Sequence, residues 1–309
     1  MSRLSTAAAL LATALVTVGL TAPGAPAPTA SAAPTVHRVL FDNSKAETAG
    51  NADWIISTAQ PDPLAQNAHP TADKDWTGAL SSWGVALQQT GEYSLKTLPP
   101  GGAFTFGTAN PLDLANFDTV VIDEPNIKFT ADEKAALMHF VQNGGGLFLI
   151  SDHTMSDRNN DGIDSPEIIN DLFTDNGVDN SDPFGFSVDL ANVHNENPRA
   201  VEDPSDPVLH GPFGTVTGSI IRDGTTMTLH PDANPTVKGI VYRPGSSGNT
   251  GAFFVTSTFG DGRIAAWGDS SPPDDDTGQP HNNLHDGWND PAGTNAALAL
   301  NATAWLSKA

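Results

Sequence analysis

The sequence has 309 residues, no cysteine and a formal net charge of −22. The lack of cysteine excludes disulfides and thiol chemistry, and the acidic balance disfavours nucleic acids and anionic membranes as partners while it attracts cations. The length is sufficient for one large hydrophobic core or two smaller ones.

The first 32 residues have the features of a secretory signal peptide. Arg3 supplies a positive start, an apolar run covers Ala7–Leu20, and the small residues Ala30–Ala32 suit a signal peptidase. The apolar run is shorter than the roughly 20 residues that a membrane-spanning helix needs. We therefore predict a signal peptide over residues 1–32, cleavage before Ala33, and a secreted, extracellular protein.

After the signal peptide, hydrophobic runs and turn residues predict alternating strands and helices. The predicted strands are His37–Asp42, Tyr93–Leu98, Phe117–Glu124, Leu147–Ser151, Gly218–Arg222, Thr225–His230, Lys238–Arg243, Gly251–Thr256 and Arg263–Trp267. The predicted helices are Asn51–Thr58, Trp76–Thr90, Ser165–Asn176, Thr294–Leu306 and one that starts with a capping box of Thr130 and Glu133. The order indicates one α/β domain over residues 33–309, with a loop-rich insertion at about 154–235.

Several of the apolar strands end in acidic or imidazole side chains. These side chains are Asp42, Asp123, Glu124, Asp152, His153 and Asp269. Ligands of open parallel sheets bind beyond the carboxyl ends of the strands, so we expect these groups to share one site. Carboxylates and imidazoles are common metal ligands, and the pattern favours a divalent metal bound by Asp42, Asp123 and Asp269. A strand-end Asp that merely caps a helix is the alternative.

The segment Asp157–Asp164 fits the start of a calcium-binding loop. Asp157, Asn159 and Asp161 offer oxygen ligands at alternate positions, Gly162 permits the sharp turn, and Asp164 is a further candidate ligand. The twelfth position holds Ile168 instead of Glu, so this is not a complete EF-hand loop. An ordinary Asx-rich turn is the alternative to a Ca²⁺ site.

A long polar loop follows the last predicted strand. It begins with Gly268, Asp269 and Ser270 and continues through His285 to Trp288. Long ordered loops are commonly functional, so His285 is a candidate acid or base, and a solvated acidic loop is the alternative. The Gly-Asp-Ser block also resembles the nucleophile block of GDSL-type esterases, although there the block follows the first strand.

The middle of the chain resembles a known superfamily. The segments Asn116–Asp123 and Phe140–His153, with the helix between them, are similar to the core of the class I glutamine-amidotransferase-like superfamily. The similarity is closest to its trehalose-utilisation (ThuA-type) branch and to uncharacterised secreted relatives. It implies an α/β flavodoxin-like three-layer sandwich, a mostly parallel sheet with helices on both faces. It does not imply amidotransferase chemistry, which needs a cysteine nucleophile.

These observations favour a secreted, metal-dependent hydrolase that acts on a phosphoester or a glycoside. Asp152, His153, Glu124 and His285 are the expected catalytic groups, because carboxyl and imidazole groups can move protons. The expected cofactors are Ca²⁺ and a second divalent metal, and the expected partner is a small molecule or an extracellular polymer. Two alternatives remain, a non-catalytic, calcium-stabilised carbohydrate-binding module and an esterase with Ser270 as its nucleophile.

Overall fold

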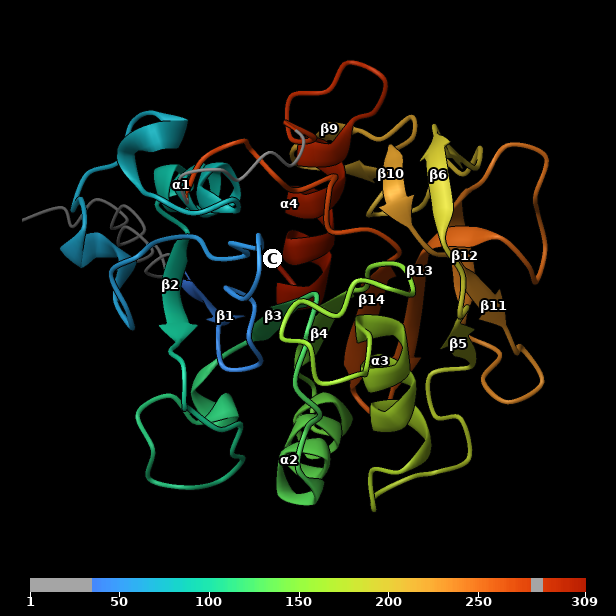
Figure 1. Ribbon diagram of the computed structural model, residues 1–309, viewed down its shortest axis with the longest axis horizontal. Helices are drawn as coiled ribbons and strands as arrows, with labels where there is room; N and C mark the ends of the chain where they lie inside the picture. Colours follow the sequence, from blue (N-terminus) through green and yellow to red (C-terminus); the bar gives the residue numbers. More distant parts are fainter. Residues whose placement is uncertain (1–34, 279–285) are drawn as a thin grey trace, which may run out of the picture. The chain divides into compact units, whose positions relative to one another are not determined.

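Parallel strands form the centre of a ten-stranded sheet in the computed structural model, which describes residues 35–278 and 286–309 (Figure 1). In spatial order the parallel strands are β2 (Tyr93–Leu98), β1 (His37–Asp42), β3 (Thr119–Asp123), β4 (Gly146–Ile150) and β14 (Gly262–Trp267). This is the flavodoxin-like order, in which the direction of winding reverses between the first strand and its neighbour β3. The predicted fold class is confirmed. The predicted signal peptide and His285 lie outside the described residues.

Antiparallel strands extend the sheet beyond β14. They are β13 (Ala252–Phe259), β11 (Met227–Leu229) and β5 (Phe186–Val188), while β12 (Lys238–Tyr242) also pairs with β13 and β7 (Arg199–Ala200) pairs with β12. Two small hairpin-like pairs lie apart from this sheet, β6 (Val193–Glu196) with β10 (Ile221–Gly224), and β8 (His210–Gly211) with β9 (Gly214–Thr215). The loop-rich segment thus supplies the short strands that complete one side of the unit Thr35–Ala309.

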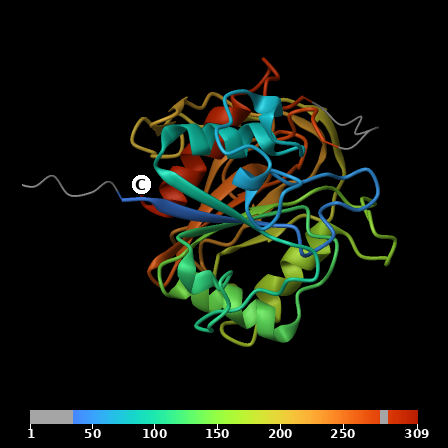
Figure 2. The ribbon, with the colours of Figure 1, turned by 90° about the vertical axis from the view of Figure 1, so that its left-hand side faces the viewer.

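Helices cover both faces of the parallel strands (Figure 2). Helices α1 (Ser81–Thr90) and α4 (Asn295–Ser307) lie on one face, and α2 (Ala131–Gln142) and α3 (Ser165–Thr174) lie on the other. Side chains on a strand alternate between faces, so Val39 and Phe41 join the core under α1 and α4 while Leu40 joins the core under α2 and α3. Because both faces are covered, these strands are apolar almost throughout.

Local signals explain most of the element boundaries. The Thr130 hydroxyl accepts a hydrogen bond from the Glu133 amide, and the Glu133 carboxylate accepts one from the Thr130 amide at 2.9 Å, which confirms the capping box of α2.

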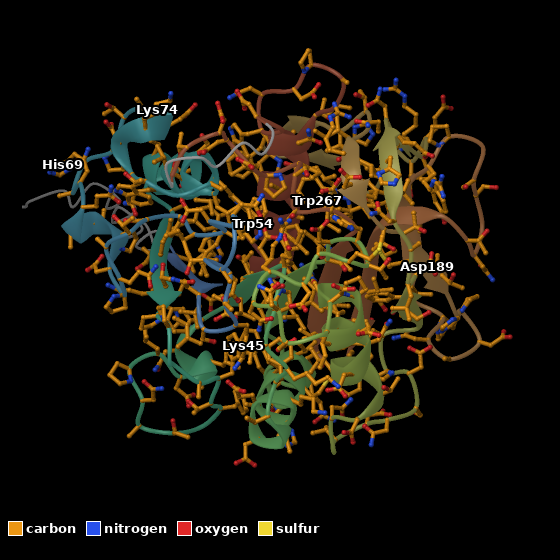
Figure 3. All side chains as sticks on the ribbon, in the orientation of Figure 1. Lys45, Trp54, His69, Lys74, Asp189 and Trp267 are labelled. Atoms are coloured by element: carbon orange, nitrogen blue, oxygen red, sulfur yellow. The ribbon has the colours of Figure 1, made fainter. Side chains whose placement is uncertain are left out.

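The predicted helix over 51–58 is wrong. Ala52, Trp54 and Ile56 enter the core at alternate positions, which is the spacing of an extended chain. Trp54 is labelled in Figure 3.

Within residues 35–278 and 286–309, the longest helices are too short or too polar to cross a lipid bilayer.

Candidate functional site

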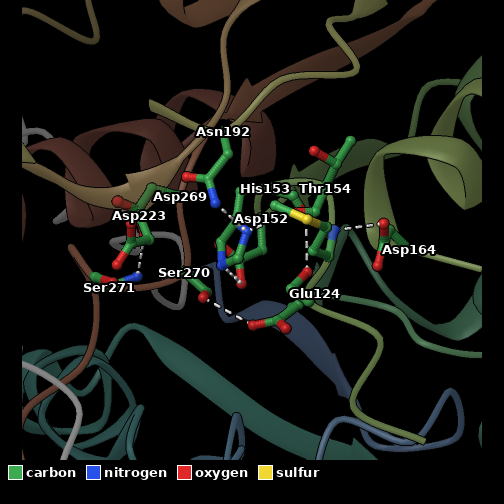
Figure 4. A network of polar contacts seen from close by, with 12 residues as sticks. Glu124, Asp152, His153, Thr154, Asp164, Asn192, Asp223, Asp269, Ser270 and Ser271 are labelled. Atoms are coloured by element: carbon green, nitrogen blue, oxygen red, sulfur yellow. Dashed lines mark hydrogen bonds and ion pairs between the residues drawn. The ribbon is translucent and has the colours of Figure 1, made fainter. Parts of the chain in front are cut away.

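The carboxyl ends of β3, β4 and β14 lie side by side and bring acidic residues together (Figure 4). Ile150 is paired with both Asp123 and Trp267, so the three strands end at the same level. Glu124 and Asp152 follow β3 and β4, and Asp269 follows β14. All are buried, with no more than 2% of each residue exposed. The structure therefore brings together four of the predicted acidic groups, Asp123, Glu124, Asp152 and Asp269.

Glu124 is held rigidly at the end of β3. Its backbone has φ +46°, in the left-handed region that residues other than glycine rarely adopt. Its carboxylate accepts hydrogen bonds from Arg158 Nε at 2.6 Å and from Ser270 Oγ at 2.8 Å. A strained backbone kept in place by surrounding contacts is common at functional sites, which makes Glu124 a candidate functional group.

Arg158 is the cation that binds the carboxyl groups of two strands. Its Nη2 donates to Asp152 Oδ2 at 3.0 Å, and its Nε bonds Glu124. Burial by itself would lower the pKa of Arg158, but the Glu124 and Asp152 carboxylates raise it above its usual value. Arg158 is not among the predicted site residues, because it occupies a variable position of the predicted calcium loop. The sequence feature that could have pointed to Arg158 is the scarcity of cations, since the chain has 14 Lys and Arg against 36 Asp and Glu.

His153 lies on the solvent side of this group. Its Nδ1 is 2.5 Å from the Thr154 carbonyl oxygen, to which it donates when it carries the ring hydrogen. Asn192 Nδ2 is 2.9 Å from the same Nδ1 and donates to it in the other tautomer. Nε2 therefore faces the Asp152 carboxyl, at 3.8 Å from Oδ2. The His153 side chain is 17% exposed and the Asp152 side chain 2%, so the imidazole separates a buried carboxyl from solvent.

Burial and mutual repulsion keep protons on the carboxyl groups of this edge. Burial, followed by the charges of Glu124 and Asp269, raises the pKa of Asp152 well above its usual value. The same causes raise the pKa of Asp123, and neither of its carboxyl oxygens has a hydrogen-bond partner among the described residues. Burial raises the pKa of Asp269 to about 7 and that of Asp274 to about 8. Several of these groups therefore exchange protons near neutral pH.

The structure places the predicted metal ligands Asp42, Asp123 and Asp269 at or just beyond the ends of β1, β3 and β14. Asp42 accepts a hydrogen bond from the Ser44 amide and interacts with Glu47, and burial raises the pKa of both carboxyl groups. Asp269 uses its two oxygens to accept from the backbone amides of Ser271 and Arg222. Within the described ranges, no three His, Asp or Glu side chains are grouped as metal ligands. Both Asp269 oxygens are thus occupied, whereas Asp42 Oδ2 and both Asp123 carboxyl oxygens have no hydrogen-bond partner among the described residues, so a metal at this edge stays a prediction.

The predicted calcium loop forms a turn with converging oxygens. Asp157 accepts from the Asp161 and Gly162 amides at 3.0 and 2.7 Å, and Asn159 Oδ1 is 3.2 Å from the same Asp161 amide. Asp164 instead accepts from the Met155 amide at 2.6 Å. The Asx-turn contacts account for these oxygens without an ion, and Ca²⁺ binding by this loop stays a prediction.

The polar loop after β14 is ordered where it is described. Asp275 accepts from the Ser82 amide at 2.6 Å, and the Trp288 amide donates to the Asp274 carbonyl at 2.8 Å. Ser270 is 2% exposed, and its hydroxyl donates to Glu124 instead of to an imidazole. The predicted esterase nucleophile thus serves, in this structure, to position Glu124.

Comparisons with known proteins give a fold. No family model and no curated protein matches the chain. Among solved structures, the mmIFT52 N-terminal domain is 12% identical, with a TM-score of 0.51 and coverage of 88% of this chain and 98% of that one. A cytoplasmic protein of Salmonella typhimurium is 13% identical, with a TM-score of 0.48 and coverage of 88% and 99%.

A ThuA-like protein of Parabacteroides merdae is also among the similar structures. It is 15% identical, with a TM-score of 0.44 and coverage of 88% of this chain and 90% of that one. At these identities the likeness concerns the fold, and the chemistry has to be argued from the site itself.

Proposed function

We propose that this chain is a hydrolase that uses acid–base catalysis at the carboxyl edge of its parallel sheet. The observation that carries the proposal is the contrast between two neighbouring carboxyl groups bridged by Arg158. Glu124 bonds the guanidinium through Nε and also accepts from Ser270, whereas Asp152 has one oxygen without a partner among the described residues and a raised pKa. Hydrolases often need one protonated and one ionised carboxyl group in the same site.

His153 and Asp152 form the proposed proton-transfer pair. A proton on either Asp152 or Nε2 can be shared between them after a small closing movement from 3.8 Å. The imidazole then exposes the proton donor to a bound substrate, since the Asp152 carboxyl itself is buried. In this proposal His153 Nε2, which makes no close hydrogen bond at 3.8 Å from Asp152, protonates the leaving oxygen as its bond to carbon breaks. Water then adds to that carbon, and the proton that the water loses returns to the pair of His153 and Asp152.

Charge favours a glycoside over a phosphoester as the substrate. The edge holds the carboxyl groups of Asp123, Glu124, Asp152 and Asp269 around one guanidinium, and both carboxylate contacts of Arg158 are internal. A phosphate would meet these carboxyl groups without a free cation to offset its charge. A neutral glycoside meets no such repulsion. We propose in addition that the protein acts outside the cell, which rests on the signal-peptide features of residues 1–32.

The test is hydrolysis of a panel of 4-nitrophenyl glycosides, with 4-nitrophenyl phosphate as the anionic comparison. We expect His153→Ala to lower kcat by on the order of 10²–10⁴-fold, the usual contribution of a positioned proton-transfer group. His139→Ala is the matched control, because His139 is exposed on α2 and its side chain is remote from the carboxyl edge. Equal rates in His153→Ala and the native protein, or turnover of the phosphate alone, would contradict the proposal.

A further inference from the structure

A cavity lies on the loops that follow β1, beside the acidic site. Its volume is about 460 Å³, within the roughly 300–1,000 Å³ range of small-molecule sites. Its polar lining consists of Asn43, Thr48, Asp53, Thr58, Gln60 and Thr77. Ile55 adds an apolar surface. Asn43 follows the last residue of β1, so the cavity opens at the same carboxyl edge as the acidic site.

The polar groups of this cavity are fixed in place by one another. Asn43 Nδ2 donates to Gln60 Oε1 at 3.2 Å, and the Thr48 hydroxyl donates to Asn43 Oδ1 at 3.3 Å. Gln60 Nε2 in turn donates to the Ser57 carbonyl at 3.3 Å. Amide groups held in this way offer donors and acceptors at set positions, which lowers the entropy lost when a ligand binds. Thr58 is exposed at the mouth of the cavity.

The chemistry of the lining selects a neutral polyhydroxylated ligand. Amides and hydroxyls can both donate and accept, and so can each hydroxyl of a sugar. The described lining includes no Lys or Arg. A phosphate or carboxylate ligand would therefore lose its hydration without gaining an ionic partner, whereas sugar hydroxyls can pair with the amides and hydroxyls of the lining. The apolar side of Ile55 suits the C–H face of a sugar ring.

The loop that forms the cavity also touches the acidic site. Thr48 lines the cavity, and three residues later Asn51 Oδ1 accepts a hydrogen bond from Arg158 Nη1 at 2.5 Å. Gly50 packs against the Arg158 backbone, where an added Cβ would lie 3.2 Å from the carbonyl oxygen. A ligand in the cavity thus lies against the loop that holds the cation of the proposed catalytic group.

We propose that this cavity binds one neutral sugar ring, the part of the substrate that is held while the neighbouring glycosidic bond is hydrolysed. The second half of this statement rests on the proposed function, but the binding itself can be measured without turnover. Affinities of single sugars for such sites are expected on the order of 1 mM, because few groups contact the ligand.

Binding is tested by saturation-transfer NMR with D-glucose, D-galactose and D-mannose, and with D-glucose 6-phosphate as the anionic counterpart. We expect saturation transfer to at least one neutral sugar and none to the phosphate. Thr58→Trp, which fills the exposed mouth, and Thr48→Val, which removes one hydroxyl, should each weaken binding at least about tenfold. Thr250→Val is the matched control, since Thr250 is exposed on a distant loop and should leave binding unchanged.

Two results would overturn the assignment. One is no saturation transfer to any neutral sugar, and the other is unchanged binding in both Thr58→Trp and Thr48→Val with circular dichroism like that of the native protein. Repeating the titration in His153→Ala separates the two proposals. Loss of turnover in His153→Ala with sugar binding retained supports both the cavity assignment and the catalytic proposal. Sugar binding in a native protein that hydrolyses no glycoside supports the cavity assignment and rejects the catalytic one.

Discussion

Asp274→Asn should make the protein more stable, by an amount that grows with pH. Asp274 is fully buried, and its Oδ1 accepts a hydrogen bond from the Asp276 amide at 2.8 Å. Its Oδ2 has no hydrogen-bond partner among the residues that the structure describes. Burial raises the pKa of this carboxyl from 3.8 to about 8. At about 1.4 kcal/mol per pKa unit, ionisation of Asp274 in the folded protein costs up to about 6 kcal/mol. Asparagine keeps the shape and the Oδ1 contact but cannot ionise.

The sign follows from which state binds the proton. Below about pH 4 both folded and unfolded Asp274 are protonated, so the carboxyl adds no pH dependence. Between about pH 4 and pH 8 the unfolded chain is ionised while the folded protein keeps its proton, and native stability falls by up to about 1.4 kcal/mol per pH unit. Above about pH 8 the contribution is constant. The advantage of Asp274→Asn should therefore rise between about pH 4 and pH 8 and then level off.

Urea unfolding at several pH values, followed by tryptophan fluorescence, measures this difference directly. The comparison is between the native protein, Asp274→Asn and the control Asp232→Asn, in which an exposed turn carboxylate is changed. The difference for the control should be the same at every pH. A pH-independent difference for Asp274→Asn, or a loss of stability that grows with pH, would refute the argument that this carboxyl is buried with its proton.

Further predictions concern export, calcium and two contacts. N-terminal sequencing of protein from culture medium should start at Ala33, and full-length protein found in the cytosol alone would contradict export. Ca²⁺ should raise Tm and Asp161→Ala should abolish the rise, because an ion bound to the folded state stabilises it; an unchanged Tm would leave only the Asx turn. Thr130→Ala should lower the free energy of unfolding by about 1 kcal/mol, with Thr130→Ser close to native in the same denaturation assay. Arg158→Met should lower it by about 3–5 kcal/mol because the buried carboxyl groups of Glu124 and Asp152 lose their cation, and Glu124→Gln added to it should recover part of the loss; no recovery would mean that the damage is packing alone.

Patterns that repeat along the chain were sufficient to predict the parallel half of the fold. Strand β1 is found over the predicted residues His37–Asp42, and α2 begins at the capping box because both of its contacts are local. The level ends of β3, β4 and β14 follow from parallel pairing, so residues just past those ends had to meet. The short strands β5–β9 escaped prediction because two to four residues show no clear alternation.

Features that depend on how a loop returns to the sheet could not be predicted from the sequence. Asp42 was expected to join the other strand-end acids, but Glu47 folds back beside it within the β1 loop and the two carboxyl groups interact. Arg158 reaches Glu124 across 34 residues, and no periodic pattern encodes that distance. Sequence spacing indicates which edge of a sheet holds the polar groups, whereas their pairing depends on loop conformation.

The electrostatics of the site and of the whole chain support the same kind of substrate. An acidic protein repels anions at long range, and at the described acidic edge the Arg158 guanidinium is already bonded to Glu124 and Asp152. The buried carboxyl groups of the site outnumber Arg158, their one cation. The folded protein tolerates them chiefly because Asp152, Asp123 and Asp274 bind protons that an exposed carboxyl would release. Those protons are what acid catalysis of a neutral substrate requires. If surface cations instead neutralised the carboxyl groups, the site would bind anions and would have no proton to give. The burial that lowers the stability of the folded protein at high pH is therefore also the source of the proposed activity.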